Sequence, residues 1–363
     1  MAPSSSPEMT AAVAPASAAD VELLRRLVDV ESLSDHEEDA VAELCRQMEA
    51  RGFRVRSDAA GNAIGEIGGG ERHIVLLGHI DTVPGRIPVR IDADTLHGRG
   101  AVDAKGPLCT FVAAAALAAP RLKSRVTVVG AVGEERIGSP GATAVAAWPA
   151  PDACIIGEPS GWDAICLGYR GTLSLYYRLR QPSRHMAGPG ESAAERAVAF
   201  WNALVAEAAV RNAASEATTT FASITPTLRS MRAEGDGLQD EAHLSIGVRL
   251  PPGVAPDALL ARLRELAGEA TLDVDGAQPA WRSDKRSPLV APFLRSIRGE
   301  GGSPRFTVKL GTSDMTVVGP AWGCPIVAYG PGDASLDHTP EERIELADYA
   351  RAIRVLAGVL EAL

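Results

Sequence analysis

The sequence has little lysine, few cysteines and no long apolar run. Only four of its 36 basic side chains are lysines, and the 46 acidic side chains give a net charge of −10. This balance argues against a general nucleic-acid binder held by phosphate contacts. The longest apolar stretch, Gly106 to Pro120, has 15 residues and is too short to cross a bilayer. Because this stretch is so short, we expect no membrane segment. The five cysteines form no CxxC pair, so we expect free thiols in the reducing cytoplasm.

The length and composition are those of a soluble globular protein. The 363 residues are 46% hydrophobic and 23% charged, which suits one large domain or two ordinary ones. Residues 1–19 are rich in Ala, Ser and Pro, and they lack the basic and apolar regions of a signal peptide. We expect them to form a disordered tail.

Three almost continuous apolar runs each end in histidine or carboxylate side chains. The runs are Ile74–Asp81, Arg125–Glu135 and Ala153–Glu158. Such runs are typical of strands buried on both faces of a sheet, with chemistry placed at their carboxyl ends. One polar ending is common in turns, but three of them favour convergence on one site.

The pattern changes after Leu167 and changes back near Pro288. Between them the expected elements are strand 172–179, helix 191–210, strands 221–229 and 242–250, helix 256–268 and strand 270–274. This order predicts an α+β open-faced sandwich inserted into an α/β domain that has helices on both faces of a mixed sheet. We therefore predict a catalytic domain of residues 20–166 and 282–363 and an inserted domain of residues 167–281. Helices are also expected at 21–28, at 107–119, at 340–363 and after Ser34, which is expected to cap its helix.

The polar ends of the apolar runs supply a possible metal site. His79 and Asp81 lie at i and i+2, so the carboxylate can orient the imidazole. Glu134 and Glu135 are adjacent carboxylates, and burying both is unfavourable unless a cation neutralises at least one. Adjacent side chains point in different directions, so one can hold a metal while the other faces a water molecule.

Further side chains of the same type lie in loops. Asp103 lies in a glycine-rich turn before a helix, and Glu158 and His338 complete the set. Two histidines with carboxylates and no thiolate suit Zn²⁺, Co²⁺ or Mn²⁺. The remaining histidines are expected to be structural, apart from His185; they are His36, His73, His97 and His243.

Five ordered motifs cover nearly the whole chain after residue 19: GHIDTVPG, GRGAVDAKG, GEERIGSPGA, IIGEPS and SLDHTPEE. They resemble those of the di-metal aminoacylase and carboxypeptidase family, which includes acetylornithine deacetylase and succinyl-diaminopimelate desuccinylase. The resemblance implies a metallopeptidase-type catalytic domain with two divalent cations, Zn²⁺ or Co²⁺, in each subunit. It assigns His79 and Glu158 to one metal, Glu135 and His338 to the other, Asp103 to both, Glu134 as general base and Asp81 as partner of His79. It also implies a cis peptide between Asp103 and Ala104.

The runs around Gly157–Leu175 and Lys309–Glu342 are similar to one branch of that family. Enzymes of this branch release lysine or ornithine from the γ-carboxyl of the terminal glutamate of a small acidic amino-group carrier protein, in lysine and arginine biosynthesis. Substrate contacts are then expected from Arg249 and from the turn Gly311, Thr312 and Ser313. One departure is Gly247, where the family usually has aspartate. Alternatives left open are acetylornithine, a succinylated diamine or a dipeptide as substrate, and a catalytically inactive relative.

The resemblance also implies a homodimer formed through the inserted domain. His185 resembles the histidine that reaches the partner subunit's site and binds the oxyanion. An acidic carrier would be repelled by a uniformly negative surface, so we expect a basic collar at the entrance. The candidates for the collar are Arg170, Arg178, Arg180 and Arg184.

Overall fold

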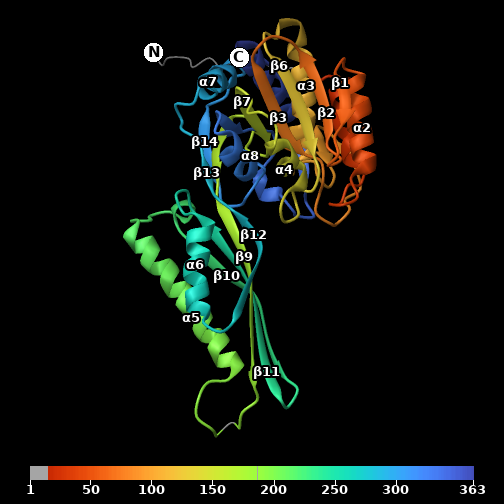
Figure 1. Ribbon diagram of the computed structural model, residues 1–363. Coiled ribbons are helices and arrows are strands. Elements are labelled where there is room, and N and C mark those ends of the chain that lie inside the picture. The colour runs from red at the N-terminus through yellow and green to blue at the C-terminus, as the bar shows by residue number, and fades with distance from the viewer. Residues whose placement is uncertain (1–14, 186) are drawn as a thin grey trace, which may run out of the picture.

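A mixed nine-stranded sheet forms the centre of the larger of two bodies of the protein (Figure 1). The structure is a computed structural model that describes residues 15–185 and 187–363. The strand order is β1-β2-β6-β3-β7-β15-β8-β13, and β14 pairs with β8. The strands are β1 (Arg54–Ser57), β2 (Ala63–Gly68), β3 (His73–His79), β6 (Arg125–Ala131), β7 (Ala153–Gly157), β8 (Ala164–Tyr169), β13 (Trp281–Arg282), β14 (Arg305–Lys309) and β15 (Ile326–Ala328). The predicted α/β class is confirmed.

Helices cover both faces of this sheet (Figure 1). The helices are α1 (Ala18–Asp29), α2 (Glu38–Glu49), α3 (Lys105–Ala118), α4 (Pro140–Ala146), α7 (Val290–Gly299), α8 (Met315–Trp322) and α9 (Leu346–Ala362). Side chains of β3 alternate between two buried clusters: Leu76 packs with α3 and α9, and Leu77 packs with α4 and α8. Burial on both faces explains why the central strands are continuously apolar in sequence.

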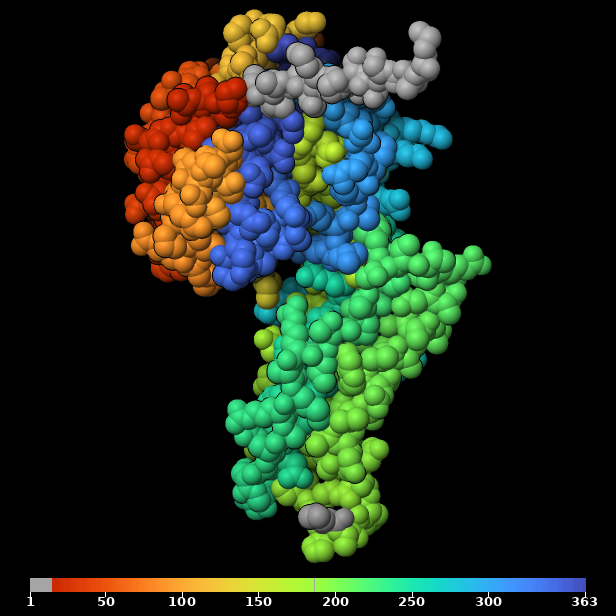
Figure 2. Space-filling model, turned by 180° about the vertical axis from the view of Figure 1, so that it is seen from behind, coloured from red at the N-terminus to blue at the C-terminus, as the bar shows by residue number. Residues whose placement is uncertain are grey.

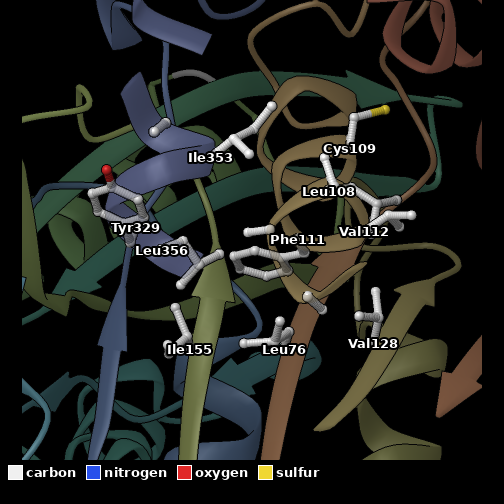
Figure 3. Packing of buried hydrophobic residues seen from close by; sticks show 14 of the residues in the cluster. Leu76, Leu108, Cys109, Phe111, Val112, Val128, Ile155, Tyr329, Ile353 and Leu356 are labelled. Carbon is white, nitrogen blue, oxygen red and sulfur yellow. The ribbon is translucent and has the colours of Figure 1, made fainter. Parts of the chain in front are cut away.

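The larger cluster is built around α3 (Figure 3). Phe111 lies between Leu356 of α9 and the strand residues Leu76 and Ile155, and all four are fully buried. Burying a side chain of this size contributes about 1.5–3 kcal/mol. This packing fixes α3, whose first turn follows Asp103, against the strands that carry the other polar ends.

A second body lies below the first (Figures 1 and 2). It is built on an antiparallel sheet with the strand order β10-β11-β9-β12. Its elements are β9 (Gly171–Pro182), α5 (Ala193–Ala214), β10 (Thr225–Gly235), β11 (Gln239–Leu250), α6 (Pro256–Ala267) and β12 (Thr271–Gln278). They follow the predicted order of strands and helices. Residues such as Leu175 and Ile246 pack under α5 and α6, and the opposite face of the sheet carries polar side chains.

The end of the chain differs from the sequence prediction. The expected helix 340–363 begins only at Leu346, because Arg343–Glu345 form strand β16 and pair with β5. This small sheet has the order β16-β5-β4, with β4 at Arg90–Asp92 and β5 at Thr95–His97. Short 3₁₀ helices lie at Ala119–Arg121, Thr220–Ala222 and Ala334–Leu336.

All five cysteines are unpaired. Among the described residues, no helix combines the length and the apolar character needed to cross a membrane. Most of the expected N-terminal tail lies outside the described residues, and α1 begins at Ala18.

Candidate active site

The polar ends of the three central strands meet at one edge of the sheet. β3 runs parallel to both β6 and β7, so their carboxyl ends lie side by side. His79 ends β3, the Glu134-Glu135 pair follows β6, and Glu158 follows β7. The sequence prediction that these ends converge is therefore confirmed.

The Asp103 carboxylate lies between two histidines from distant parts of the chain. Nε2 of His79 is 3.1 Å from its Oδ1, and Nε2 of His338 is 3.0 Å from its Oδ2. The same nitrogen of His338 is 2.9 Å from Oε1 of Glu135. Ligand atoms of His79, Asp103 and Glu135 all lie within 4.8 Å of one another. One carboxylate with a different imidazole on each oxygen fits a pair of divalent cations that share it.

Asp81 contacts both His79 and the backbone of the Glu134-Glu135 pair. Nδ1 of His79 donates to the Asp81 carbonyl at 3.0 Å and lies 3.4 Å from its carboxylate, which leaves Nε2 facing Asp103. The Asp81 carboxylate accepts hydrogen bonds at 3.0 Å from the backbone N–H groups of Glu134 and Glu135. Ser34 donates to it at 2.7 Å. The same carboxylate therefore positions both the histidine and the glutamate pair.

The prediction that Ser34 caps a helix is wrong. α2 begins at Glu38, and its N-cap residue Glu37 makes no capping hydrogen bond with its side chain. Glu37 instead accepts from the backbone N–H of Gly133, just before the glutamate pair. A local capping pattern gave way here to long-range contacts with the site.

Glu342 is a residue of the site that the sequence reasoning missed. It is 1% exposed and accepts hydrogen bonds from the backbone N–H groups of Val102 and Asp103, at 2.9 and 3.1 Å. Arg99 pairs with it at 2.7 Å. The peptide between Asp103 and Ala104 is cis, as the family resemblance implies. Glu342 belongs to the SLDHTPEE motif, so the sequence contained a signal for it. Only the fold shows that it binds the backbone N–H groups of Val102 and Asp103.

Several carboxylates of the site are buried where their charge is unfavourable. Burial raises the pKa of Glu134 and of Glu158 well above the ordinary value, and each carboxylate lies near other acidic groups. Burial also raises the pKa of Asp314 to about 7. One carboxylate oxygen of Asp314 has no hydrogen-bond partner among the described residues. This excess of buried acid is what bound cations would stabilise.

The pKa values of the two histidines are also raised, but for an imidazole this shift favours the charged form. Burial alone would lower the pKa of His79, but the Asp103 and Asp81 carboxylates outweigh it and raise the pKa. Hydrogen bonds to Asp103 and Glu135 raise the pKa of His338 to about 10. In the protein without metal these imidazoles thus act as the cations of the cluster.

A cleft of about 510 Å³ opens beside this cluster and reaches the open face of the second sheet. Glu134 and Glu135 line one side, and Arg249 lines the other. Gly311 and Thr312 also line it, and Nη1 of Arg249 donates to the Thr312 hydroxyl at 3.4 Å. Ser313, expected at the same place, is 1% exposed and turns toward α8, where its hydroxyl accepts from the N–H of Met315.

His185 does not reach the cleft within one chain. It is exposed and lies beyond the far end of β9, in the loop before α5. The first residues of β9 line the cleft, and the twelve-residue strand is roughly 36 Å long. Any contact between His185 and such a cleft requires a second copy of the chain.

The predicted basic collar is wrong for Arg170. This arginine is 2% exposed and donates to the Thr225 hydroxyl at 2.8 Å and the Arg249 carbonyl at 3.1 Å. It thus ties the start of the second sheet together.

The other expected collar residues do not line the cleft. Arg178 pairs with Asp273, Arg180 pairs with Glu241, and Arg184 donates to the carbonyl of Gly188. Among the described residues, the arginine and lysine side chains that line the cleft besides Arg249 are Arg136, Arg229 and Lys309, which the sequence reasoning missed.

Tyr169 is also a cleft residue without a sequence signal. Its side chain is buried, and in the described part of the chain its hydroxyl has no hydrogen-bond partner. Burial raises its pKa well above the ordinary value, as do the nearby carboxylates, of which Glu158 contributes most. The phenol therefore keeps its proton and can donate a hydrogen bond into the cleft.

Comparison with known proteins gives matches over most of the chain. The chain is 45% identical to a [LysW]-lysine hydrolase from Deinococcus radiodurans, over 93% of this chain and 95% of that protein. It is 30% identical to a [LysW]-lysine/[LysW]-ornithine hydrolase from Sulfurisphaera tokodaii, over 81% of this chain and 82% of that protein. Its fold is similar to that of an M20 family metallo-carboxypeptidase from Sulfolobus solfataricus, with a TM-score of 0.76, 18% identity and coverage of 94% and 98%.

The family model adds the position of the match. The model described as peptidase family M20/M25/M40 matches residues 75–362, which include the three strand ends, Asp103 and His338. The family expected from the five motifs is thereby confirmed. The chain belongs to peptidase family M20/M25/M40.

Proposed function

We propose that the protein is a metal-dependent amide hydrolase that releases lysine, or ornithine, from the γ-carboxyl of the C-terminal glutamate of an amino-group carrier protein. The observation that carries the hydrolase is the Asp103 carboxylate shared by two histidines, with Glu134 beside it in the same cleft. The names of the relatives support lysine attached to LysW as substrate.

The residues present fit two divalent cations, and we propose Zn²⁺ or Co²⁺. His79, Asp103 and Glu158 would hold one, and Asp103, Glu135 and His338 the other. When bound, such a pair lowers the pKa of a water molecule and polarises the scissile carbonyl. Buried acid in the cluster and the absence of a thiolate from these five residues both favour this assignment.

Glu134 is proposed as the general base. It takes a proton from the attacking water and later delivers it to the leaving nitrogen, which balances the hydrolysis. Its backbone is fixed by Asp81, so its carboxylate is held at the cleft wall while Glu135 turns toward His338. In water its pKa would be too low for this task, and burial raises that pKa.

His185 is proposed to act in the site of a second subunit, as oxyanion donor. The chain would divide into a catalytic domain of residues 20–166 and 282–363 and a domain of residues 167–281 that forms the dimer. α5 supports a dimer because Val198, Val205 and Val210 are each more than 40% exposed on it. Val198 and Val205 lie seven residues apart, on one face of the helix, and exposed apolar side chains gathered on one face favour an interface.

The test of function is a direct assay. Purified metal-loaded protein is incubated with the lysine adduct of the carrier, with acetylornithine and with a succinylated diamine, and the released amino acid is quantified. We expect lysine release from the carrier adduct and at least tenfold lower kcat/KM on the small substrates, with Glu134→Gln as the inactive control. Faster hydrolysis of acetylornithine would make the protein an ordinary deacylase.

The test of the shared site is complementation. His185→Ala and Glu134→Gln chains, each nearly inactive alone, are mixed under conditions of proven subunit exchange. A random mixture contains hybrid dimers with one intact site, so about a quarter of wild-type activity is expected. If no activity is recovered, His185 does not act in the site of the partner subunit.

A further inference from the structure

An arginine side chain occupies the space beside Gly247, the glycine that departs from the family pattern. Gly247 is on β11, on the open face of the second sheet, and β10 lies beside it. A Cβ atom at 247 would lie 2.8 Å from Nη2, 2.9 Å from Nε and 3.0 Å from Cζ of Arg229. Arg229 is the extra residue of a β-bulge between Leu228 and Ser230. The bulge and the missing side chain together let its guanidinium lie over Gly247.

This guanidinium lies in the cleft near a second one. Both Arg229 and Arg249 line the cleft, and Arg249 stands two residues after Gly247 on the same face of β11. Burial lowers the pKa of Arg249, and the charge of Arg229 lowers it further, so the two cations are close enough to repel each other.

Neither cation has a carboxylate partner in the part of the chain that the structure describes. Other arginines of this sheet are paired: Arg178 with Asp273, Arg180 with Glu241 and Arg232 with Glu234. Within residues 15–185 and 187–363, the only hydrogen bond of the Arg249 guanidinium is a long one to the Thr312 hydroxyl. Two neighbouring cations without counter-charge in a cleft are unfavourable unless an anionic ligand neutralises them.

We propose that Arg229 is a specificity-determining residue: with Arg249 it binds a substrate that carries one carboxylate on each side of the scissile amide. The substrate class is an N-acyl α-amino acid whose acyl group has its own carboxylate. The inference rests on the proposed function, because a γ-glutamyl adduct has both groups. These are the α-carboxylate of the released amino acid and the free α-carboxylate of the terminal glutamate.

The positions of the two arginines assign one carboxylate to each. Arg249 is half-buried beside Thr312, so it suits the carboxylate of the small leaving amino acid. Arg229 is exposed, so it suits the carboxylate of a chain end that enters from outside. Acetylornithine has no carboxylate on its acyl side and leaves Arg229 without a partner. The pair therefore selects against a neutral acyl group.

The test compares lysine derivatives that differ in one charge. The substrates are Nα-(N-acetyl-γ-glutamyl)-lysine, the same compound with the glutamyl α-carboxylate as carboxamide, and Nα-succinyl-lysine. Metal-loaded wild type is expected to prefer the first over the carboxamide by about 10- to 100-fold in kcat/KM, the range of a charge-assisted hydrogen bond. Comparable rates on the succinyl and γ-glutamyl compounds would identify the acyl carboxylate alone as the selected feature. A lower succinyl rate would show that the glutamyl geometry also counts.

Three variants test the residue. Arg229→Gln is expected to reduce the preference to less than about threefold. Gly247→Asp should do the same, because the new carboxylate would displace or pair with the guanidinium. Arg232→Gln, on the same strand but outside the cleft, should keep the wild-type preference. Equal losses on both substrates in Arg229→Gln, or an unchanged preference, would overturn the proposal.

Binding to the inactive Glu134→Gln protein separates this proposal from the proposed function. The carboxylate and carboxamide compounds are titrated into the metal-loaded protein by calorimetry. Preferential binding without turnover by wild type would support the Arg229 site and refute the hydrolase assignment. Turnover with no preference in either rate or binding would refute the Arg229 site and leave the hydrolase assignment in place.

Discussion

The cleft has two walls of opposite charge: one has an excess of buried carboxylates, and the other has two arginines that lack a carboxylate partner among the described residues. We call the carboxylates at the strand ends, together with Asp103, the acidic wall, and the two arginines of the second sheet the basic wall. The acidic wall comprises Asp103, Glu134, Glu135 and Glu158, and the basic wall comprises Arg229 and Arg249. Elsewhere on the surface most arginines form local ion pairs, for example Arg262 with Glu265 on α6.

The difference between the walls lies in how deeply their charges are buried. Glu158 is 8% exposed, and burial raises its pKa and that of Glu134 well above the ordinary value. In the basic wall Arg229 is exposed and Arg249 is half-buried. Burial lowers the pKa of Arg249, and the charge of Arg229 lowers it further. Buried carboxylates are stabilised by tightly bound cations, because each uncompensated buried charge is unfavourable. Solvent-exposed arginines suit an anionic ligand that binds and dissociates.

The largest effect is expected when the counter-charge of the acidic wall is removed. Chelation should abolish activity, because the proposed chemistry depends on cations held by Asp103 and its neighbours. Zn²⁺ or Co²⁺ should restore it. Full turnover by protein shown by elemental analysis to be free of metal would contradict this prediction.

A single change in the acidic wall should separate chemistry from metal binding. Glu134→Gln should lower kcat by about 10³-fold or more, since an amide cannot accept the proton. Both metals should remain, as measured by elemental analysis, whereas Glu135→Gln and Asp103→Asn should lose metal. Loss of metal from Glu134→Gln would show that Glu134 is a ligand.

A single change in the basic wall should have a smaller effect. Arg249→Gln should lower kcat/KM on the carrier adduct by about 10- to 100-fold through loss of a charge-assisted hydrogen bond. Arg178→Gln is the matched control, because Arg178 is exposed, pairs with Asp273 and lies outside the cleft. Equal effects of the two substitutions would indicate general steering of the carrier rather than a specific contact.

The smallest effect is on stability, and it depends on pH. Asp314 titrates near 7 in the folded protein instead of 3.8, so in metal-free protein the folded state holds more protons between these values. Stability is then greatest below the unfolded pKa and falls as pH rises through 7. Between about pH 5 and 7.5 the loss should be about 2–3 kcal/mol. Burial of Glu134 and Glu158 acts in the same direction.

Urea unfolding of chelated protein at the two pH values measures this loss. Asp314→Asn should reduce it, because the amide does not titrate. A metal-free protein that is equally stable at both pH values would contradict the assignment of these shifts to buried acid.

The sequence predicted the acidic wall far better than the basic wall. Apart from Asp103, which lies in a glycine-rich turn, the acidic residues follow apolar strands that are buried on both faces, so a local pattern in the chain marks their place. Arg229 lies in a β-bulge, which breaks the alternation, and its importance depends on the empty space at Gly247 across the strand pair. Arg170 looks like any other arginine in sequence, and only tertiary contacts show that it is buried.

Boundaries that depend on distant pairing were also missed. Arg343–Glu345 were expected to be helical, but they form β16 because β5 lies beside them. Ser34 has a typical capping sequence, yet it donates to Asp81 from a loop 47 residues away. In both places a tertiary contact replaced the local preference.

The most direct test of the account is a crystal structure of metal-loaded Glu134→Gln protein with Nα-(γ-glutamyl)-lysine bound. We predict two metal ions that share the Asp103 carboxylate, identified by anomalous scattering, and an amide carbonyl directed toward them. The lysine α-carboxylate should contact Arg249, and the glutamyl α-carboxylate should contact Arg229. Metal ions held without Asp103, or both carboxylates directed to solvent, would contradict the account.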